Sequence, residues 1–500
     1  MTTTRLVALA SQPNPAVEVL PETWARAEKF AGFVAKAAAG SAKVYGVNTG
    51  FGFLSDVAID RDKLQQLQVN LIRSHACGVG PLAAPEIVRG LLILRAHTFL
   101  LGHSGVSKSV IDTVLSFLRF DILPEVPEQG SVGASGDLAP LAHLAMGLLG
   151  EGRALRKDPS GKPYMVAALC REHGVQPVVP RAKEGLALIN GTQFMTVIAA
   201  KAVERASALV TAADAIAALS LDAIRGTGDA MDPRVQAVRP HPGQKLSAEN
   251  LRTMLSGSDA IMSSHQNCGK VQDPYSFRCV PQVHGATRDA LAFVRDVVDR
   301  ELNSVTDNPL VFDDGSMISG GNFHGQPVAL SMDFLGIALA EIGSISERRT
   351  EKLTNPAMSG LPSFLVKDSG LNSGFMIPHV VAAALVSENK VLCHPASVDS
   401  IPTSADKEDH VSMGPIAARK AVQIAGNVAS ILAVEVLAAA QGIDLLAPLT
   451  PSPALQALHG HIRRISPTMA VDRSLADDIS QVAQWIAGGG ISEVVGVRLH

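Results

Sequence analysis

The stretch GPIAARKAVQIAGNVASILAVEVLAAAQGIDLL, residues 414–446, does most to decide the fold. Its apolar residues recur at helical spacing, so we predict one continuous helix here. At 1.5 Å per residue such a helix would run for about 50 Å. Helices longer than about 25 residues are typical of a bundle or an oligomer spine rather than of a small globule.

The same helical pattern continues through most of the chain. It predicts further helices over residues 21–39, 85–101, 108–120, 196–225, 288–302, 327–353, 375–393, 452–465 and 474–487. Strand signals are few, at residues 42–45 and 310–312. Because strands and helices do not alternate regularly, a parallel sheet is not expected, and we predict a mainly α fold with a long-helix bundle core.

No internal repeat or linker divides the chain, so we predict a single unit over residues 1–500. Within it, a loop-rich N-terminal part (about 1–190) precedes the central long-helix bundle and the C-terminal helices (about 191–500). Glycine- and asparagine-rich loops, which are a common place for chemistry, lie at residues 47–53, 130–137, 188–193 and 319–325.

Composition limits the functional classes. The 43 Lys and Arg residues against 47 Asp and Glu give a net charge of −4, which gives no sign of nucleic-acid or membrane-surface binding. Hydrophobic residues make up 47% and charged residues 18%, enough for a large core and for subunit contacts. The odd number of cysteines without a CxxC pair argues against a disulfide framework or zinc ribbon and favours a reducing compartment: Cys77, Cys170, Cys268, Cys279 and Cys393.

Targeting signals are also weak. Residues 1–13 are too short for a signal peptide, and no run of about 18 uncharged apolar residues predicts a membrane-spanning helix. We therefore expect a cytoplasmic protein. Phosphate-loop, dinucleotide and H-E-x-x-H motifs do not occur, and His459-Gly460-His461 is only a weak metal pattern, so no metal is expected.

One string carries chemistry: GSVGASGDLAPLAH, residues 130–143. Asp137 can cap the helix that follows, and Pro140 suits its first turn. Ala134-Ser135-Gly136 would then lie just before a positive helix end. Taken alone, the tripeptide is more simply interpreted as a glycine-rich cap.

The whole string closely resembles the signature of the aromatic amino-acid ammonia-lyases, most closely their histidine-specific branch, and the resemblance runs from Tyr45 past Glu408. It implies that the Gly136 amide nitrogen attacks the Ala134 carbonyl and that two waters leave. The product is the electrophile 4-methylidene-imidazol-5-one (MIO), made without an external cofactor. The residue types suit this reaction, because glycine has no Cβ in the way and Ser135 carries a hydroxyl that can leave.

Such an electrophile addresses a definite problem. Ammonia is a poor leaving group and the β-hydrogen of histidine is weakly acidic, so an electrophile and a base are both needed. Attack on the amine and attack on the side-chain ring both remain open. Tyr45, in VYGVNTGFG (44–52), matches the family's base loop. Since a phenol pKa near 10 is high for a base at neutral pH, we expect a positive environment to lower it.

Other matches supply binding groups. In VQDPYSFRC (271–279) the family pattern assigns Arg278 to the substrate carboxylate, which suits its planar fork, with Gln272 and Tyr275 lining the cofactor and the carboxylate end. Asn190, in LINGTQ, matches the asparagine that hydrogen-bonds near the electrophile, and Phe323, in GGNFH, would pack on the cofactor or the substrate ring.

Two residues bear on the substrate. His75 matches the histidine-specific branch, and Glu408 matches the glutamate that faces the imidazole. A carboxylate can accept an imidazole N–H, whereas a phenyl ring would leave it buried and unpaired. The chain departs from many relatives in having Asp406-Lys407 where they have Asn-Gln.

The resemblance thus implies a carbon–nitrogen lyase that converts L-histidine to trans-urocanate and ammonia, the first step of histidine degradation. It also implies a homotetramer with shared active sites. Three alternatives stay open: a phenylalanine or tyrosine ammonia-lyase or aminomutase with the same electrophile, a non-catalytic helical assembly protein, and a fumarase-type lyase, whose signature loop is not found.

Overall fold

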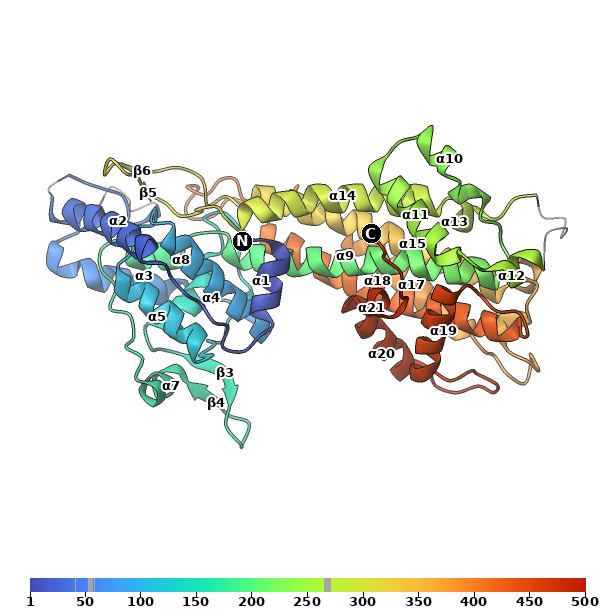
Figure 1. The fold of residues 1–500 in the computed structure, drawn as a ribbon. Coiled ribbons are helices and arrows are strands. Elements are labelled where there is room, and N and C mark those ends of the chain that lie inside the picture. The colour runs from blue at the N-terminus through green and yellow to red at the C-terminus, as the bar shows by residue number, and fades with distance from the viewer. Residues whose placement is uncertain (41, 53–56, 58, 265–270) are drawn as a thin grey trace. The chain divides into compact units, whose positions relative to one another are not determined.

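A computed structural model describes residues 1–500 apart from residues 41, 53–56, 58 and 265–270, a gap that includes Cys268. The described chain is mainly helical, with short strands (Figure 1), so the prediction of a mainly α fold is confirmed. Two compact units divide it. The first comprises Met1–Lys201, Arg295–Met332 and Pro395–Arg419, and the second comprises Ala202–Val294, Asp333–His394 and Lys420–His500. The boundary predicted near residue 190 remains a prediction.

The longest helices are the ones that the apolar patterns predicted: α9 (Gln193–Ala223), α14 (Val280–Glu301), α15 (Gln326–Thr354) and α18 (Gly414–Leu445). Each of these four helices contains one boundary between the units, and the remaining boundary lies between His394 and Pro395. Helix α18 confirms the continuous helix expected from residue 414.

Three of these helices, α9, α15 and α18, are long and apolar enough to cross a membrane by length and composition. The expectation that no segment qualifies is therefore wrong on this measure, because it required a run without charges. Their most apolar stretches are 83, 67 and 72% buried inside the protein. Packing against other helices accounts for an apolar composition of this kind.

The first unit combines short helices with paired strands. Its helical elements are α1 (Thr3–Ala10), α2 (Pro21–Ala39), η2 (Arg61–Lys63), α3 (Leu64–His75), α4 (Pro85–Leu100), α5 (Lys108–Arg119), α6 (Leu138–Leu148), α7 (Val166–His173) and α8 (Glu184–Ile189). Its strands form three antiparallel pairs: β1 (Val79–Leu82) with β2 (Pro127–Gln129), β3 (Arg153–Lys157) with β4 (Pro163–Met165), and β5 (Leu310–Val311) with β6 (Met317–Ile318).

Strand β5 confirms one of the two strand predictions, and the other is wrong. Residues 42–45 lead into a turn. The Asn48 side chain hydrogen-bonds the backbone groups that a neighbouring strand would otherwise bond. Its Oδ1 accepts from the Val44 N–H at 2.8 Å, and its Nδ2 donates to the Ala42 carbonyl at 2.9 Å. An asparagine side chain that bonds nearby backbone groups in this way favours a turn over a strand.

A small apolar cluster holds this turn in place. Phe30 and Val34 of α2 pack with Val47 and with Val311 of β5, and all four side chains are buried. Val47 lies two residues after Tyr45, so the cluster fixes the segment that carries this tyrosine.

The described residues of the second unit form helices joined by turns and loops. Besides parts of the four longest helices it contains η3 (Asp229–Met231), α10 (Pro233–Ala237), α11 (Pro242–Leu255), α12 (Asp259–Ser263), α13 (Tyr275–Arg278), α16 (Pro356–Ser359), η4 (Ser363–Leu365), α17 (Met376–Leu392), α19 (Pro453–Ile465), α20 (Ala476–Ala487) and α21 (Gly490–Val494). Ala382 of α17 packs on Ile431 and Val434 of α18 in one of its core clusters.

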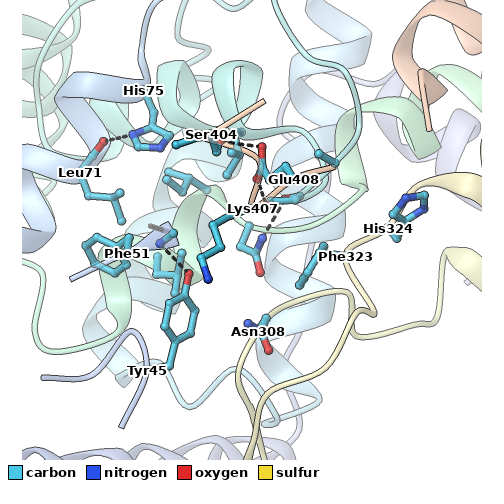
Figure 2. A pocket seen from close by; sticks show the side chains of 18 of the residues that line it. Tyr45, Phe51, Leu71, His75, Asn308, Phe323, His324, Ser404, Lys407 and Glu408 are labelled. Carbon is cyan, nitrogen blue, oxygen red and sulfur yellow. Dashed lines mark hydrogen bonds between the residues drawn. The ribbon is translucent and has the colours of Figure 1, made fainter. Parts of the chain in front are cut away.

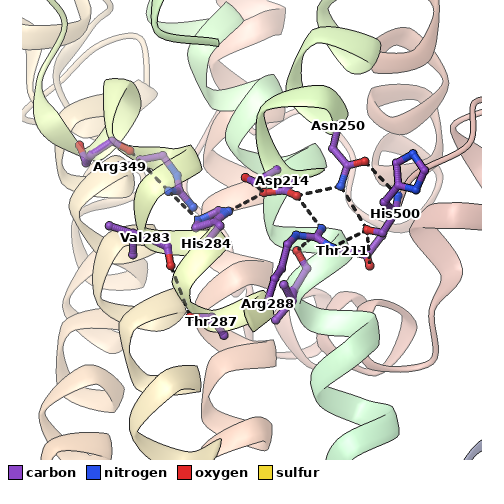
Figure 3. Close-up of polar contacts among 12 residues, drawn as sticks. Thr211, Asp214, Asn250, Val283, His284, Thr287, Arg288, Arg349 and His500 are labelled. Carbon is purple, nitrogen blue, oxygen red and sulfur yellow. Dashed lines mark hydrogen bonds and ion pairs between the residues drawn. The ribbon is translucent and has the colours of Figure 1, made fainter. Parts of the chain in front are cut away.

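Buried charges connect the long helices within the second unit (Figure 3). Asp214 of α9 contacts His284 and Arg288 of α14, at 2.7 and 2.6 Å. Arg349 of α15 donates two hydrogen bonds to Glu435 of α18, at 2.5 and 2.8 Å. Burial by itself would raise the pKa of Asp214, but the Arg288 guanidinium and His284 hold that pKa at about 2. The carboxylate therefore stays ionised in the core and keeps its partners satisfied.

We expect Asp214→Asn to destabilise the protein by about 3–5 kcal/mol, because the variant leaves the largely buried Arg288 guanidinium without its counter-charge. Thermal unfolding followed by calorimetry checks the direction, with Asp232→Asn, at an exposed ion pair with Arg234, as the control. A lowered pKa means that the contribution of Asp214 is present above its unfolded pKa and is lost as the pH falls towards 2. An unchanged midpoint for Asp214→Asn at neutral pH would contradict this account.

Candidate active site

A cavity of about 700 Å³ lies in the first unit, and segments far apart in sequence line it (Figure 2). Seven of the residues singled out in the sequence are among them: Tyr45, His75, Ala134, Ser135, Asn190, Phe323 and Glu408. The first unit therefore gathers loops from near residues 45, 135, 190, 323 and 408 around one space.

The tripeptide is held by a close backbone approach. Gly136 has a φ of +71° and bridges Gly191, and the Asp137 N–H donates to the Gly191 carbonyl at 2.7 Å. A Cβ on Gly136 would lie 2.1 Å from that carbonyl oxygen, so the position admits only glycine. Asn190 Nδ2 donates to the Ser135 carbonyl at 2.7 Å. The tripeptide is thereby fixed against the residues that follow α8.

Glu408 contacts the serine of the tripeptide directly. The Ser135 hydroxyl donates to Glu408 Oε1 at 2.5 Å. The other carboxylate oxygen, Oε2, accepts from the Thr403 and Ser404 hydroxyls, each at 2.9 Å. Thr403 and Glu408 also exchange two backbone hydrogen bonds, at 3.0 and 3.3 Å. The loop thus closes on itself and orients the carboxylate.

Asp137 does not cap α6, contrary to the sequence expectation. No hydrogen bond from its side chain caps that helix, and its Oδ2 instead accepts from the Met195 N–H, in the first turn of α9, at 3.0 Å. Burial is the main cause that raises the pKa of Asp137 to about 7. The carboxyl therefore links the segment after the tripeptide to α9. Pro140 does lie in the first turn of α6, as expected.

The environment of Tyr45 also differs from the expectation. The Gly52 N–H donates to its hydroxyl oxygen at 3.4 Å, and its ring meets that of Phe51 edge to face. Burial raises the pKa of Tyr45, and the Glu408 carboxylate acts in the same direction, so the expectation of a lowered pKa is wrong in this structure. A negative neighbour and loss of water both disfavour a phenolate.

His75, at the end of α3, presents a defined hydrogen-bonding pattern. Its Nδ1 lies 2.8 Å from the Leu71 carbonyl oxygen, which can only accept, so Nδ1 carries the hydrogen. In the neutral ring Nε2 is then an acceptor. His75 can therefore offer a lone pair in a cavity that also holds an acidic side chain.

Two histidines of the cavity wall were missed among the sequence candidates. The rings of His324 and His410 stack with centroids 5.4 Å apart, and His324 Nε2 lies 3.2 Å from the His410 carbonyl oxygen. Both neighbour residues that were singled out, His324 after Phe323 and His410 two residues after Glu408. Their position in the same motifs is the signal that could have found them. Lys407 also lines the cavity.

Gln272, Tyr275 and Arg278 are not among the residues lining the cavity; they belong to the second unit. Tyr275 is 70% exposed, and the Arg278 guanidinium lies 4.4 Å from the centre of its ring. Within the described part of the chain, the buried Arg278 Nε has no hydrogen-bond partner.

No group of three or more His, Cys, Asp or Glu side chains in the described residues could hold a metal ion. The two histidines of the weak metal pattern have other contacts. His459 Nε2 lies 2.7 Å from Asp444 Oδ1, and the His461 ring stacks on Trp485.

Residues 1–464 match the family model described as aromatic amino acid lyase. The chain belongs to the aromatic amino acid lyase family. A histidine ammonia-lyase from Sorangium cellulosum (strain So ce56) is 55% identical over 468 residues, covering 92% of this chain and 90% of that protein.

Solved structures of other proteins share the fold. Histidine ammonia-lyase from Trypanosoma cruzi matches with a TM-score of 0.91 and 44% identity, over 99% of this chain and 93% of that one. Tyrosine aminomutase from Streptomyces globisporus matches with a TM-score of 0.93 and 38% identity, over 100% and 98%. The fold thus supports more than one reaction, and the site has to discriminate between them.

We expect Gly136→Ala to lower the midpoint of thermal unfolding clearly, because both its φ and the Gly191 carbonyl exclude a side chain. The backbone conformation alone costs about 1–2 kcal/mol. Gly174→Ala is the matched control, since Gly174 has a φ of +65° and nothing within 4 Å of an added Cβ. If both variants lowered the midpoint of thermal unfolding equally, the close approach of Gly136 to Gly191 would not be a tight constraint.

Proposed function

We propose that this protein is a histidine ammonia-lyase, a carbon–nitrogen lyase that eliminates ammonia from L-histidine to give trans-urocanate, the first step of histidine degradation. The observation that carries the proposal is the contact between the Ser135 hydroxyl and Glu408 in a cavity that Tyr45 also lines. The 55% identity to a histidine ammonia-lyase over most of both chains supports it.

The electrophile of this proposal is MIO, formed from Ala134, Ser135 and Gly136. The residues present fit such a group: Gly136 lies where a Cβ would strike Gly191, and the buried Asn190 Oδ1 has no partner among the described residues. When formed, the group supplies an electron-poor centre that assists departure of ammonia. Asn190 Nδ2, which donates to the Ser135 carbonyl, would stabilise negative charge on that oxygen.

Tyr45 is the base in this proposal and takes the β-proton of the substrate. Its raised pKa keeps most of the phenol neutral near pH 7, so the reactive phenolate is a minor form there. A base that acts only when deprotonated gives a rate that rises with pH towards its pKa. We therefore propose that the reaction is favoured by alkaline pH.

Glu408 and His75 select the substrate. A carboxylate acceptor and an imidazole acceptor in one cavity suit a side chain that brings an N–H donor, as imidazole does. A phenyl ring brings no donor and would leave both of these acceptors unpaired. Phe323 provides an apolar surface in the same cavity for a flat ring.

The substrate carboxylate needs a cation, and we propose that Arg278 supplies it, with Gln272 and Tyr275 beside it, on assembly of a homotetramer with shared sites. The 70% exposure of Tyr275 and the unpartnered Arg278 Nε are consistent with a surface completed by association. Cytoplasmic location is part of the same proposal.

A second candidate is a tyrosine ammonia-lyase or aminomutase, which the TM-score of 0.93 to a tyrosine aminomutase favours. Purified enzyme supplied in turn with L-histidine, L-tyrosine and L-phenylalanine separates the two. We expect ammonia and the ultraviolet absorbance of urocanate from histidine at a far higher kcat/KM. Faster turnover of tyrosine, or a β-amino acid product, would favour the second candidate.

We expect Ser135→Ala to abolish nearly all activity while leaving the fold intact, since it removes the hydroxyl that leaves during MIO formation. Intact mass is the direct measurement. The wild-type chain should be lighter by two waters than the mass calculated from its sequence. The variant should differ from its own calculated mass by one water at most. Ser116→Ala, on the exposed side of α5, is the control. A fully active Ser135→Ala enzyme would refute the cofactor.

We expect Tyr45→Phe to lower kcat by a factor on the order of 10²–10⁴ with little change in KM, the usual contribution of a general base. The alkaline rise in kcat/KM should disappear as well. Tyr164→Phe, which changes a tyrosine on β4, should behave as wild type. Wild-type turnover by Tyr45→Phe would remove this residue as the base.

A further inference from the structure

The hydrogen bond between Ser135 and Glu408 joins the hydroxyl that has to leave to a carboxylate. We propose that Glu408 is a catalytic residue in the formation of the electrophile, where it carries the proton that the Ser135 hydroxyl needs in order to leave as water. The proposal rests on the proposed function, because it concerns the maturation of the same tripeptide. It gives Glu408 a task that precedes any contact with an amino acid.

Geometry favours this task. The separation of 2.5 Å between Ser135 Oγ and Glu408 Oε1 lies at the short end of the range for a hydroxyl that donates to a carboxylate, so Oε1 directly contacts the oxygen that has to leave. Thr403 and Ser404 hold the other oxygen of Glu408, which leaves Oε1 directed at the serine.

The loop that presents Glu408 is itself unusual. Ser404, Ala405 and Asp406 all have positive φ, at 53, 53 and 62°. Side-chain-bearing residues rarely adopt this conformation, and a run of three needs support from surrounding contacts. Here the support is the pairing of Thr403 with Glu408, so the strained turn serves to place this carboxylate.

The chemistry balances without an oxidant. In ring closure a bond forms between the Gly136 nitrogen and the Ala134 carbonyl carbon. The oxygen of that carbonyl leaves as water with the amide hydrogens of Gly136 and Ser135. In the second dehydration the Ser135 Cβ–Oγ bond breaks and its electron pair leaves with oxygen, while the pair from the Cα–H bond forms the Cα=Cβ double bond. The Glu408 carboxylate takes the proton released from Cα and passes it to Oγ, which already carries its own hydrogen and so leaves as water. Glu408 ends the step as the carboxylate that it was at the start.

Two other titratable groups near the tripeptide form hydrogen bonds with other partners. Asp137 accepts from the Met195 N–H, and the Tyr45 hydroxyl accepts from the Gly52 N–H. Among the residues that the structure describes, Glu408 is the titratable side chain hydrogen-bonded to the Ser135 hydroxyl. Loss of that hydroxyl also frees Oε1, the acceptor that an imidazole N–H would then use. Maturation thus prepares the substrate contact.

The test follows intact mass during cell-free synthesis of the full chain, with samples denatured at intervals. We expect Glu408→Gln to lose the Ser135 hydroxyl more slowly than wild type by a factor on the order of 10², so that species retaining at least one of the two waters accumulate. Asp406→Asn is the matched control, since it removes a neighbouring charge outside the cavity lining at a positive φ that asparagine tolerates. This control should mature at the wild-type rate.

Loss of both waters by Glu408→Gln at the wild-type rate would overturn the proposal while leaving the proposed function intact. A wild-type chain that never loses two waters would overturn both. Circular dichroism establishes that the variants fold. If Glu408→Gln does not fold, the double change Thr403→Val and Ser404→Ala decides, because it keeps the carboxylate but frees Oε2. Delayed yet complete maturation of that variant supports the proposal, and an unchanged rate overturns it.

Discussion

The approach of two glycine backbones, Gly136 and Gly191, is the constraint on which the candidate site depends. No side chain fits between them, since a Cβ on Gly136 would lie 2.1 Å from the Gly191 oxygen. This approach places the tripeptide beside Asn190, whose amide holds the Ser135 carbonyl. Because Ser135 is fixed at its carbonyl, its hydroxyl can be aligned with Glu408 from a loop more than 270 residues later in the chain.

Burial then sets the chemistry of the groups around the tripeptide. Asp137 and Tyr45 both have raised pKa values, and loss of water is the largest cause for each. Burial therefore favours the neutral, proton-carrying forms of these two groups. Such an environment suits proton transfers between neighbouring groups, which both the proposed maturation of the tripeptide and the proposed elimination require. In the core of the second unit the pKa of a buried acid is lowered instead, because Arg288 and His284 keep Asp214 ionised.

Much of the fold was predictable because its helices are long and their apolar residues periodic. Helix α2 was predicted with its observed ends, and α18 to within one residue. The failures have local causes. Residues 42–45 form a turn because the Asn48 side chain occupies the backbone groups that a strand would use. Asp137 bonds the first turn of α9, a contact across more than fifty residues that no local capping rule includes.

The sequence by itself determined the helical architecture and the family and indicated the candidate site residues, since periodicity and motifs are local properties of the chain. Tertiary structure alone decided that Ser135 bonds Glu408, that Oε2 is held by Thr403 and Ser404, and that the pKa of Tyr45 is raised rather than lowered. It also brought His324 and His410 into the same cavity wall. Burial and the distance between groups far apart in the chain govern these properties, and neither is encoded by residue spacing.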